Sequence, residues 1–328
     1  MTPQYYSDEF RKFNTYLRDQ GENHLYRIAS GASDYDYDWT KVCMDKIGDR
    51  MQGISLHYYT CTGWSGPKGS ATKFDTDQYY WALGKCLEIE EVIKKHKAIM
   101  DKKDPKGKIG LLVDEWGTWW DEEPGTIPGH LYQQNALRDA FVAALSLNVF
   151  HKYTDRVKMA NIAQVVNVLQ SMILTDQEGT GHMVLTPTYW VFQMYTPFQE
   201  ATYLPVDLES ETIQCSTEYF KEKQKTADNT TRPCPLLSAS AAKTTDGGIV
   251  LALTNVSLDK TQTVDFNLEG YNAKTVSGRI LTSKNVADFN DFKNPNVVAP
   301  KEYKDAKLKK NVLSVKIPAK SIIVLNIK

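Results

Sequence analysis

The stretch that decides the fold is KIGLLVDEWGTWW, residues 108–120, in which an apolar run ends directly at two acids. Residues 109–113 have the length and composition of a strand buried on both faces, as parallel strands covered by helices are. Ionised carboxylates are costly inside such a strand, so Asp114 and Glu115 mark the point where the chain leaves the core. They indicate either chemistry at the end of the strand or a structural ion pair.

Strand-like and helix-like segments alternate on both sides of this run. GISLHYYT (53–60) and LYRIAS (25–30) are typical of strands, and AQVVNVLQSMIL (163–174) carries a further one. Helical spacing marks four segments: one from the Thr2-Pro3 start to a stop at Gly21, then 38–47, 75–100 and 137–149. This alternation predicts parallel strands with right-handed crossovers, hence an α/β domain of barrel or doubly wound type.

Helical periodicity disappears beyond about residue 183, where short β-rich runs separated by turn residues take over. That pattern fits an antiparallel β-sandwich. We therefore predict two domains, an α/β domain over residues 1–182 and a β-sandwich over residues 183–328.

The composition narrows the function classes. The chain has 328 residues, 41% hydrophobic and 24% charged, with a formal net charge of -1 and no basic block, so neither nucleic acid nor a membrane surface is expected as a partner. Five cysteines without CxxC spacing indicate neither a metal site nor a complete disulfide framework, and at most Cys215 and Cys234 pair. The polar start MTPQYYSDEF is no signal peptide, which leaves the compartment unknown.

In a parallel barrel the active groups gather where the strands end, which selects His57-Tyr58-Tyr59, Asp114-Glu115 and the region 164–170. Side chains alternate along a strand, so Glu115 is expected over the mouth of the pocket and Asp114 toward the helices as an ion pair or cap. The run GLLVDE also has the form of a Walker B strand. Because no G-x-x-x-x-G-K-[ST] motif is present, the ATPase interpretation is disfavoured.

Four ordered blocks, YRIASGASDYDYDWT, GISLHYYT, LLVDEWGTWW and DRVKMANIAQVVNVL, resemble conserved blocks of glycoside hydrolase family 51, the α-L-arabinofuranosidases. The resemblance implies a (β/α)8 barrel, of which this chain holds strands resembling five to eight, followed by an antiparallel, jelly-roll-like β-sandwich. It also implies a retaining mechanism that needs no cofactor and no metal.

The resemblance also assigns roles to single residues. Glu115 matches the nucleophile, His57 and Tyr59 match residues lining the arabinose pocket, Trp119 matches an aromatic wall, and Gln164 matches a residue that hydrogen-bonds the sugar. Taken singly, each has a structural alternative: a core histidine, aromatic packing or a helix cap. A retaining glycosidase needs two carboxyl groups about 5 to 5.5 Å apart, one ionised and one protonated. Glu115 is expected to be the ionised one, with Tyr59 or His57 as donors.

The family's acid/base glutamate lies in a Gly-Asn-Glu motif just before a stretch like MTPQYY, which here stands at residues 1–6. We therefore expect the chain to be the C-terminal portion of a longer enzyme, with barrel strands one to four and the acid/base residue upstream. A partial barrel leaves sheet edges unpaired, so we expect a second copy or a partner chain to complete it, or an unclosed barrel. Losing the general acid costs about 10²–10⁴ in rate.

The first functional hypothesis is a retaining, exo-acting α-L-arabinofuranosidase whose partner is an arabinose-containing polysaccharide or oligosaccharide, such as arabinan or arabinoxylan. The alternatives are an endoglucanase of the same family and a catalytically silent sugar-binding remnant.

Overall fold

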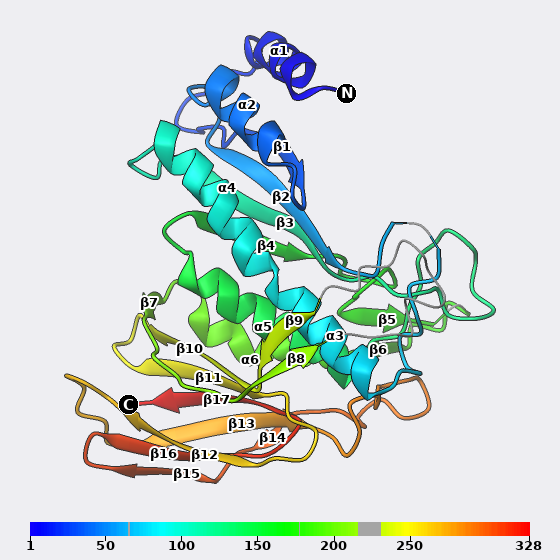
Figure 1. Cartoon of the computed structure of the whole chain (residues 1–328), viewed down its shortest axis with the longest axis vertical. Coiled ribbons are helices and arrows are strands. Elements are labelled where there is room, and N and C mark those ends of the chain that lie inside the picture. Colours follow the sequence, from blue (N-terminus) through cyan, green and yellow to red (C-terminus); the bar gives the residue numbers. More distant parts are fainter. Residues whose placement is uncertain (65, 177, 216–230) are drawn as a thin grey trace. The chain divides into compact units, whose positions relative to one another are not determined.

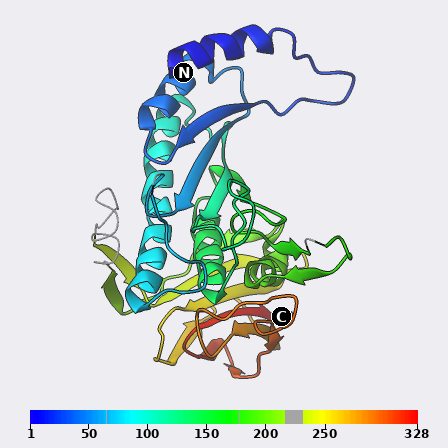
Figure 2. The same cartoon turned by 90° about the vertical axis from the view of Figure 1, so that its right-hand side faces the viewer.

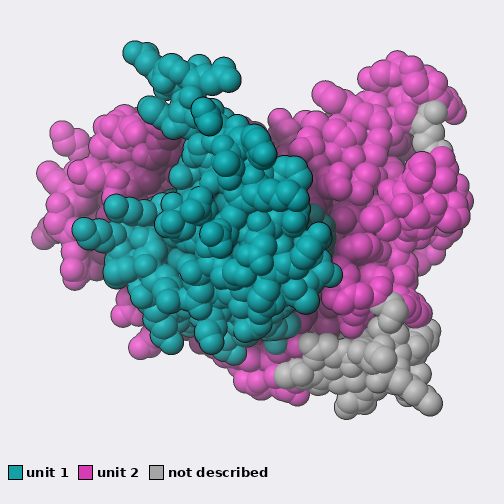
Figure 3. Space-filling model, turned by 90° about the horizontal axis from the view of Figure 1, so that it is seen from above, with its two compact units in different colours: residues 1–59, 88–116, 153–162 teal, residues 60–87, 117–152, 163–328 magenta. Residues whose placement is uncertain are grey.

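The structure is a computed structural model that describes residues 1–64, 66–176, 178–215 and 231–328. These residues form two compact units, which Figure 3 shows in different colours. Unit 1 consists of residues 1–59, 88–116 and 153–162, and unit 2 of residues 60–87, 117–152 and 163–328. The division at 182/183 between a barrel domain and a sandwich domain stays a prediction.

Unit 1 is built on a sheet of four strands in the order β1-β2-β3-β4, seen side by side in Figure 1. The strands are β1 (Ile28–Ser33), β2 (Gly53–Thr60), β3 (Gly110–Thr118) and β4 (Val157–Ile162). The pairs β1/β2 and β3/β4 are parallel, as the alternation of strands and helices predicts. β1 approaches β2 closely at Gly31, where a Cβ atom would lie 1.5 Å from the Ser55 carbonyl oxygen.

The helices of unit 1 are α1 (Pro3–Asn14), α2 (Tyr37–Ile47) and α4 (Ile89–Lys103). Figures 1 and 2 show α2 and α4 on one face of the sheet. The predicted start of α1 is confirmed, because Thr2 accepts a hydrogen bond from the Tyr5 backbone N–H, but the helix ends at Asn14 rather than running to Gly21. Beyond α4, buried Arg156 donates to the Asp104 carboxylate over 2.8 Å and fixes the turn that leads into β3.

The fourth strand lies upstream of its predicted place. We expected it within residues 163–174, whereas β4 is Val157–Ile162 and the later run is mostly loop. Asn167 and Leu169 have φ values of 59° and 52°, which a strand does not allow. Only the end of that run is extended, as β5 (Ile173–Thr175), and it pairs with β6 (Met183–Leu185) in a separate ribbon.

Unit 2 contains the helices α3 (Thr76–Leu87), α5 (Leu137–Lys152) and α6 (Pro187–Tyr195), and the short 3-10 helix η1 (Thr196–Phe198). The sequence predicts one helix over residues 75–100, but the structure has two, α3 and α4, which meet at Glu88 and belong to different units. α5 packs against the β-sheet that follows it in the chain: Asn148 and His151 hydrogen-bond Ser238 and Ser240 over 3.0 and 2.9 Å.

The rest of unit 2 is the expected antiparallel β-sandwich. A six-stranded sheet has the order β14-β13-β17-β11-β10-β7, and a three-stranded sheet the order β12-β16-β15. The six strands, in chain order, are β7 (Thr202–Leu204), β10 (Leu237–Lys243), β11 (Ile249–Asn255), β13 (Val276–Thr282), β14 (Lys301–Glu302) and β17 (Ser321–Ile327). The other three are β12 (Gln262–Asn267), β15 (Ala306–Lys309) and β16 (Val312–Ile317), and β8 (Thr212–Cys215) pairs with β9 (Arg232–Pro235) in a ribbon.

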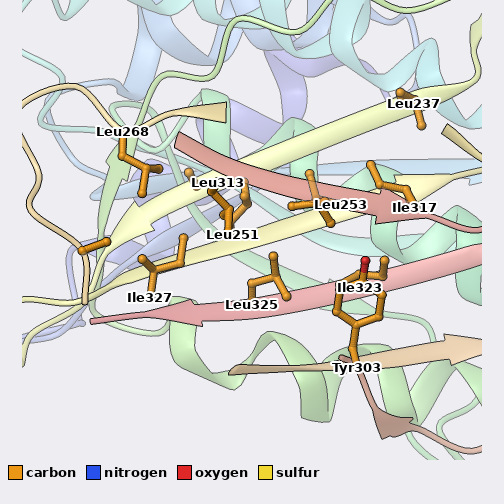
Figure 4. Packing of buried hydrophobic residues seen from close by; sticks show 13 residues of the cluster. Leu237, Leu251, Leu253, Leu268, Tyr303, Leu313, Ile317, Ile323, Leu325 and Ile327 are labelled. Atoms are coloured by element: carbon orange, nitrogen blue, oxygen red, sulfur yellow. The ribbon is translucent and has the colours of Figure 1, made fainter. Parts of the chain in front are cut away.

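The core of the sandwich comes from alternate residues of β11, β16 and β17. Leu251, Leu325 and Leu313 are among its fully buried members, and Figure 4 shows them together between the two sheets. Burying each such side chain contributes about 1.5–3 kcal/mol.

The five cysteines lie buried and outside any disulfide of the described residues, including Cys215 and Cys234, the one pair left open by the sequence. On the β8/β9 ribbon these two are offset, because Cys215 pairs with Arg232 and Cys234 with Ile213. None of the helices in the described part of the chain has the length and apolarity needed to cross a membrane.

Candidate active site

The candidate site of unit 1 lies on two neighbouring strands of the parallel sheet. His57 and Tyr59 are two residues apart on β2, so their side chains leave the same face of the strand. Glu115 lies on the adjacent strand β3, where the apolar run Leu111–Val113 ends. The three residues that the sequence selects on these two strands therefore meet, although β3 continues past Glu115 to Thr118 instead of ending at the acids.

Glu115 is held by donors from β2. The Tyr59 O–H donates to Glu115 Oε1 over 2.7 Å, and Tyr59 itself is buried at 3% exposure. His57 Nδ1 lies 3.4 Å from Glu115 Oε2. A carboxylate fixed by a rigid phenol, with its own side chain 42% exposed, is oriented and still accessible. Such a group can attack an electrophilic carbon.

Asp114 belongs to the same cluster, which corrects the sequence prediction. His57 Nε2 lies 3.3 Å from Asp114 Oδ1, so one imidazole contacts both acids. The expectation that Asp114 points to the opposite side, toward the helices, is therefore wrong.

The physical reason is an irregularity in the β3/β4 pairing. Val113 pairs with Ala160 and Trp116 with Ile162, so Asp114 and Glu115 together face the single residue Asn161. Two residues opposite one form a β-bulge, which interrupts the alternation and re-aims side chains.

The surroundings of Asp114 act on its protonation. Burial raises the pKa of Asp114 and the charge of Glu115 raises it further, whereas His57 acts to lower it. Asp114 Oδ1 is buried without a hydrogen bond, so its approach to His57 is an electrostatic contact. Burial therefore pushes Asp114 toward its protonated form.

The two remaining predicted site residues, Trp119 and Gln164, belong to unit 2. The Trp119 backbone N–H donates to the Thr60 carbonyl over 3.2 Å, and its ring meets Trp64 edge to face. Gln164 is exposed just after β4, and its N–H donates to the Val168 carbonyl over 3.2 Å. Their roles toward a sugar stay predictions.

Sequence reasoning missed one contribution to this cluster. Asp114 was assigned to the wrong side because a bulge has no signature in composition. In the described ranges, no group of three or more His, Cys, Asp or Glu side chains is arranged to hold a metal ion.

Comparison with known proteins identifies the family. Residues 114–321 match the family model described as the alpha-L-arabinofuranosidase C-terminal domain. An intracellular exo-alpha-L-arabinofuranosidase of Bacteroides ovatus is 58% identical over 327 residues, which are 100% of this chain and 60% of that protein. The chain belongs to the α-L-arabinofuranosidases of glycoside hydrolase family 51.

Solved structures of this arabinofuranosidase family share the fold. The GH51 arabinofuranosidase from Xanthomonas axonopodis pv. citri matches with a TM-score of 0.91 at 42% identity, covering 100% of this chain and 63% of that one. The arabinose complex of the Thermotoga maritima α-L-arabinofuranosidase matches with a TM-score of 0.77 at 23% identity, covering 99% of this chain and 62% of the other. The predicted fold, part of a (β/α)8 barrel followed by a β-sandwich, is confirmed. The chain spans about three fifths of the length of these relatives.

Proposed function

We propose that this chain carries the nucleophile of a retaining, exo-acting α-L-arabinofuranosidase that releases terminal arabinofuranose from arabinan, arabinoxylan or their oligosaccharides. The observation that carries the proposal is the Glu115 carboxylate held by the Tyr59 O–H at 2.7 Å, on the parallel strand β3 of an arabinofuranosidase fold. The name of the Bacteroides ovatus relative, an exo-alpha-L-arabinofuranosidase, supports the choice of sugar and of exo action.

In the first step a Glu115 oxygen forms a bond to the anomeric carbon, while the bond from that carbon to the leaving oxygen breaks. The leaving group departs with the electron pair. Water then attacks the same carbon, the bond between that carbon and Glu115 breaks to free the carboxylate, and the water gives up one proton to the solvent. The Tyr59 O–H holds Glu115 Oε1 in place, and His57 lies between Glu115 and its neighbour Asp114. Trp119 and Gln164 are proposed as the aromatic wall and as a hydrogen-bonding partner of the sugar.

Protonation of the leaving group is the step that these residues do not supply. No glutamate of this sequence stands in a Gly-Asn-Glu motif. The chain by itself is therefore expected to react with glycosides whose leaving group needs no proton. It is then expected to stall at the covalent intermediate, because general-base catalysis raises the rate of hydrolysis by a factor of about 10²–10⁴.

The test uses 2,4-dinitrophenyl α-L-arabinofuranoside, whose leaving phenolate is stable without protonation. We expect a burst of dinitrophenolate equivalent to the protein concentration, and peptide mapping that places one arabinosyl group on Glu115. Glu115→Gln removes the burst, whereas Glu178→Gln, at an exposed glutamate of unit 2, retains it.

Attachment of the sugar elsewhere, or an undiminished burst from Glu115→Gln, refutes the assignment. Arabinose binding without any burst in the parent chain favours the silent sugar-binding alternative. No relative described above favours an endoglucanase.

A further inference from the structure

One imidazole of unit 1 lies between two acids that are neighbours in the sequence. His57 Nε2 lies 3.3 Å from Asp114 Oδ1, and His57 Nδ1 lies 3.4 Å from Glu115 Oε2. Each ring nitrogen therefore faces a carboxyl oxygen, whereas the proposed reaction requires an acid at Glu115 alone. We call Asp114, His57 and Glu115 the acid–imidazole cluster.

A neutral imidazole cannot serve both acids when both are ionised. It carries one N–H, on either Nδ1 or Nε2, and offers a lone pair at the other nitrogen. A lone pair directed at a carboxylate oxygen is repulsive, so one acid of the cluster is then left without a donor. With one more proton in the cluster, both ring nitrogens are matched to the oxygens that they face.

Two arrangements accommodate the additional proton between Asp114 and His57. If Asp114 carries it, the carboxyl O–H donates to Nε2, and the ring donates from Nδ1 to Glu115. If Nε2 carries it, the imidazolium donates to both carboxylates. The two arrangements have the same number of protons and the same net charge. In each of them an Nδ1–H group faces Glu115.

The contacts of the two acids place this proton on the side of Asp114. Asp114 Oδ1 is buried and accepts no hydrogen bond, so a proton shared with Nε2 satisfies it. Glu115 Oε1 already accepts from the Tyr59 O–H over 2.7 Å. Burial also raises the pKa of Asp114, which acts in the same direction.

The strands on either side of the cluster contribute one further acid. On β1, Ser33 pairs in register with His57 and donates from its hydroxyl to the Asp34 carboxylate over 3.3 Å. The Asp34 N–H donates to the His57 carbonyl over 2.9 Å. Residues 160–162 of β4, which lie opposite the bulge, have no titratable side chain. An experiment on the shared proton therefore has to separate the cluster from Asp34 and from Tyr59.

We propose that Asp114 is a positioning residue for the arabinosyl transfer: it shares a proton with His57 Nε2 and so keeps the Nδ1–H group directed at Glu115. This rests on the proposed function, because Asp114 has this task only if Glu115 attacks the sugar. With Tyr59 on Oε1 and His57 on Oε2, both carboxylate oxygens are oriented before the attack. Loss of the shared proton at higher pH leaves one N–H between two carboxylates, and Glu115 is then held less firmly.

The first test observes the imidazole without turnover. Nitrogen NMR of the chain with isotope-labelled histidine identifies the His57 ring by its absence from His57→Gln. The parent chain is expected to retain the shared proton at pH about 7. Asp114→Asn is expected to lose it at a pH lower by about one unit or more, because one negative charge beside the ring is gone. Asp34→Asn leaves the ring titration unchanged, as does the matched control Asp49→Asn, whose side chain is 78% exposed.

The second test is the pH dependence of the dinitrophenolate burst. Because this leaving group needs no proton, a general acid adds no alkaline limb to the profile. The burst rate of the parent chain is expected to fall about tenfold at alkaline pH, as for a lost hydrogen bond to a charged group. Asp114→Asn should be slower at neutral pH, because its amide also accepts the ring proton, but should show no alkaline fall. Tyr59→Phe should retain the fall.

An unchanged ring titration in Asp114→Asn overturns the proposal. So does an alkaline fall that persists in this variant, because a residue that only supports the fold slows the burst equally at every pH. If Asp114→Asn does not fold, Asp114→Ser, which also lacks a titratable group, carries both measurements. Missing attachment of arabinose to Glu115 refutes the proposed function instead, and the ring titration still decides whether the proton is shared.

Discussion

His151 gives unit 2 a pH-dependent stability that one substitution removes. Its Nδ1 atom hydrogen-bonds the Ser240 hydroxyl over 2.9 Å, and its ring stacks on Phe198 with centroids 4.5 Å apart. Burial lowers the pKa of His151 to about 4, because the imidazolium form loses its hydration there.

The direction and the magnitude of this pH effect on the free energy of unfolding follow from the linkage between proton binding and folding. The folded-state pKa lies below the unfolded value of about 6.5, so the folded state binds this proton less tightly than the unfolded state does. The stability that neutral His151 contributes to the folded state is fully present above pH about 6.5 and is lost as the pH falls toward about 4. One pKa unit corresponds to about 1.4 kcal/mol, so the loss is about 2 kcal/mol at pH about 5 and reaches at most about 3.4 kcal/mol.

The assay is urea unfolding of the chain at pH about 7 and about 5, a window above the range in which carboxylates of ordinary pKa titrate. Between these two pH values the free energy of unfolding of the parent chain is expected to fall by about 2 kcal/mol more than that of His151→Gln. The glutamine can still hydrogen-bond Ser240 but does not titrate. His130→Gln, at an exposed histidine, retains the full pH dependence. Equal losses in His151→Gln and in the parent chain would refute the account.

Three further predictions concern the packing. Arg156→Met leaves the Asp104 carboxylate buried without its cation and is expected to cost about 3–5 kcal/mol in urea unfolding, and adding Asp104→Asn should restore part of the loss. Gly31→Ala places a Cβ atom 1.5 Å from the Ser55 carbonyl oxygen, so separation of β1 from β2 and a loss of about 3 kcal/mol or more are expected in the same assay. The buried thiols, with the pKa of Cys43 raised to about 11 and that of Cys86 to about 12, should react with Ellman's reagent only after unfolding; rapid reaction of the native chain would contradict their burial.

Periodicity and composition predict the elements whose pattern is local. The strand 53–60 has the predicted bounds, and the helix at 38–47 is off by one residue at its start. The break between α3 and α4 was missed because Glu88 has φ −60° and ψ −20°, so the helical spacing of side chains continues through it. The fourth strand was misplaced because residues 163–174 are rich in β-forming side chains, whereas left-handed conformations at Asn167 and Leu169 turn the backbone.

In the candidate site too, features set by the local sequence pattern could be predicted, and features set by the backbone of other segments could not. His57 and Tyr59 could be predicted to share a face because the i, i+2 rule is exact within a regular strand. Asp114 could not, because a bulge depends on the register of a neighbouring strand that the sequence does not specify.

The bulge also explains why two acids follow a buried strand without unfolding it. A regular continuation would send one carboxyl group to each face, and the one directed at the helices would need a partner in an apolar layer. With Asp114 and Glu115 together opposite Asn161, both reach the imidazole of His57, and Trp116 returns to the buried pattern at 1% exposure. The remaining cost is the raised pKa of Asp114, which its approach to His57 offsets only in part. One additional residue in β3 thus brings both carboxyl groups to the imidazole of His57 while the apolar run before them stays buried.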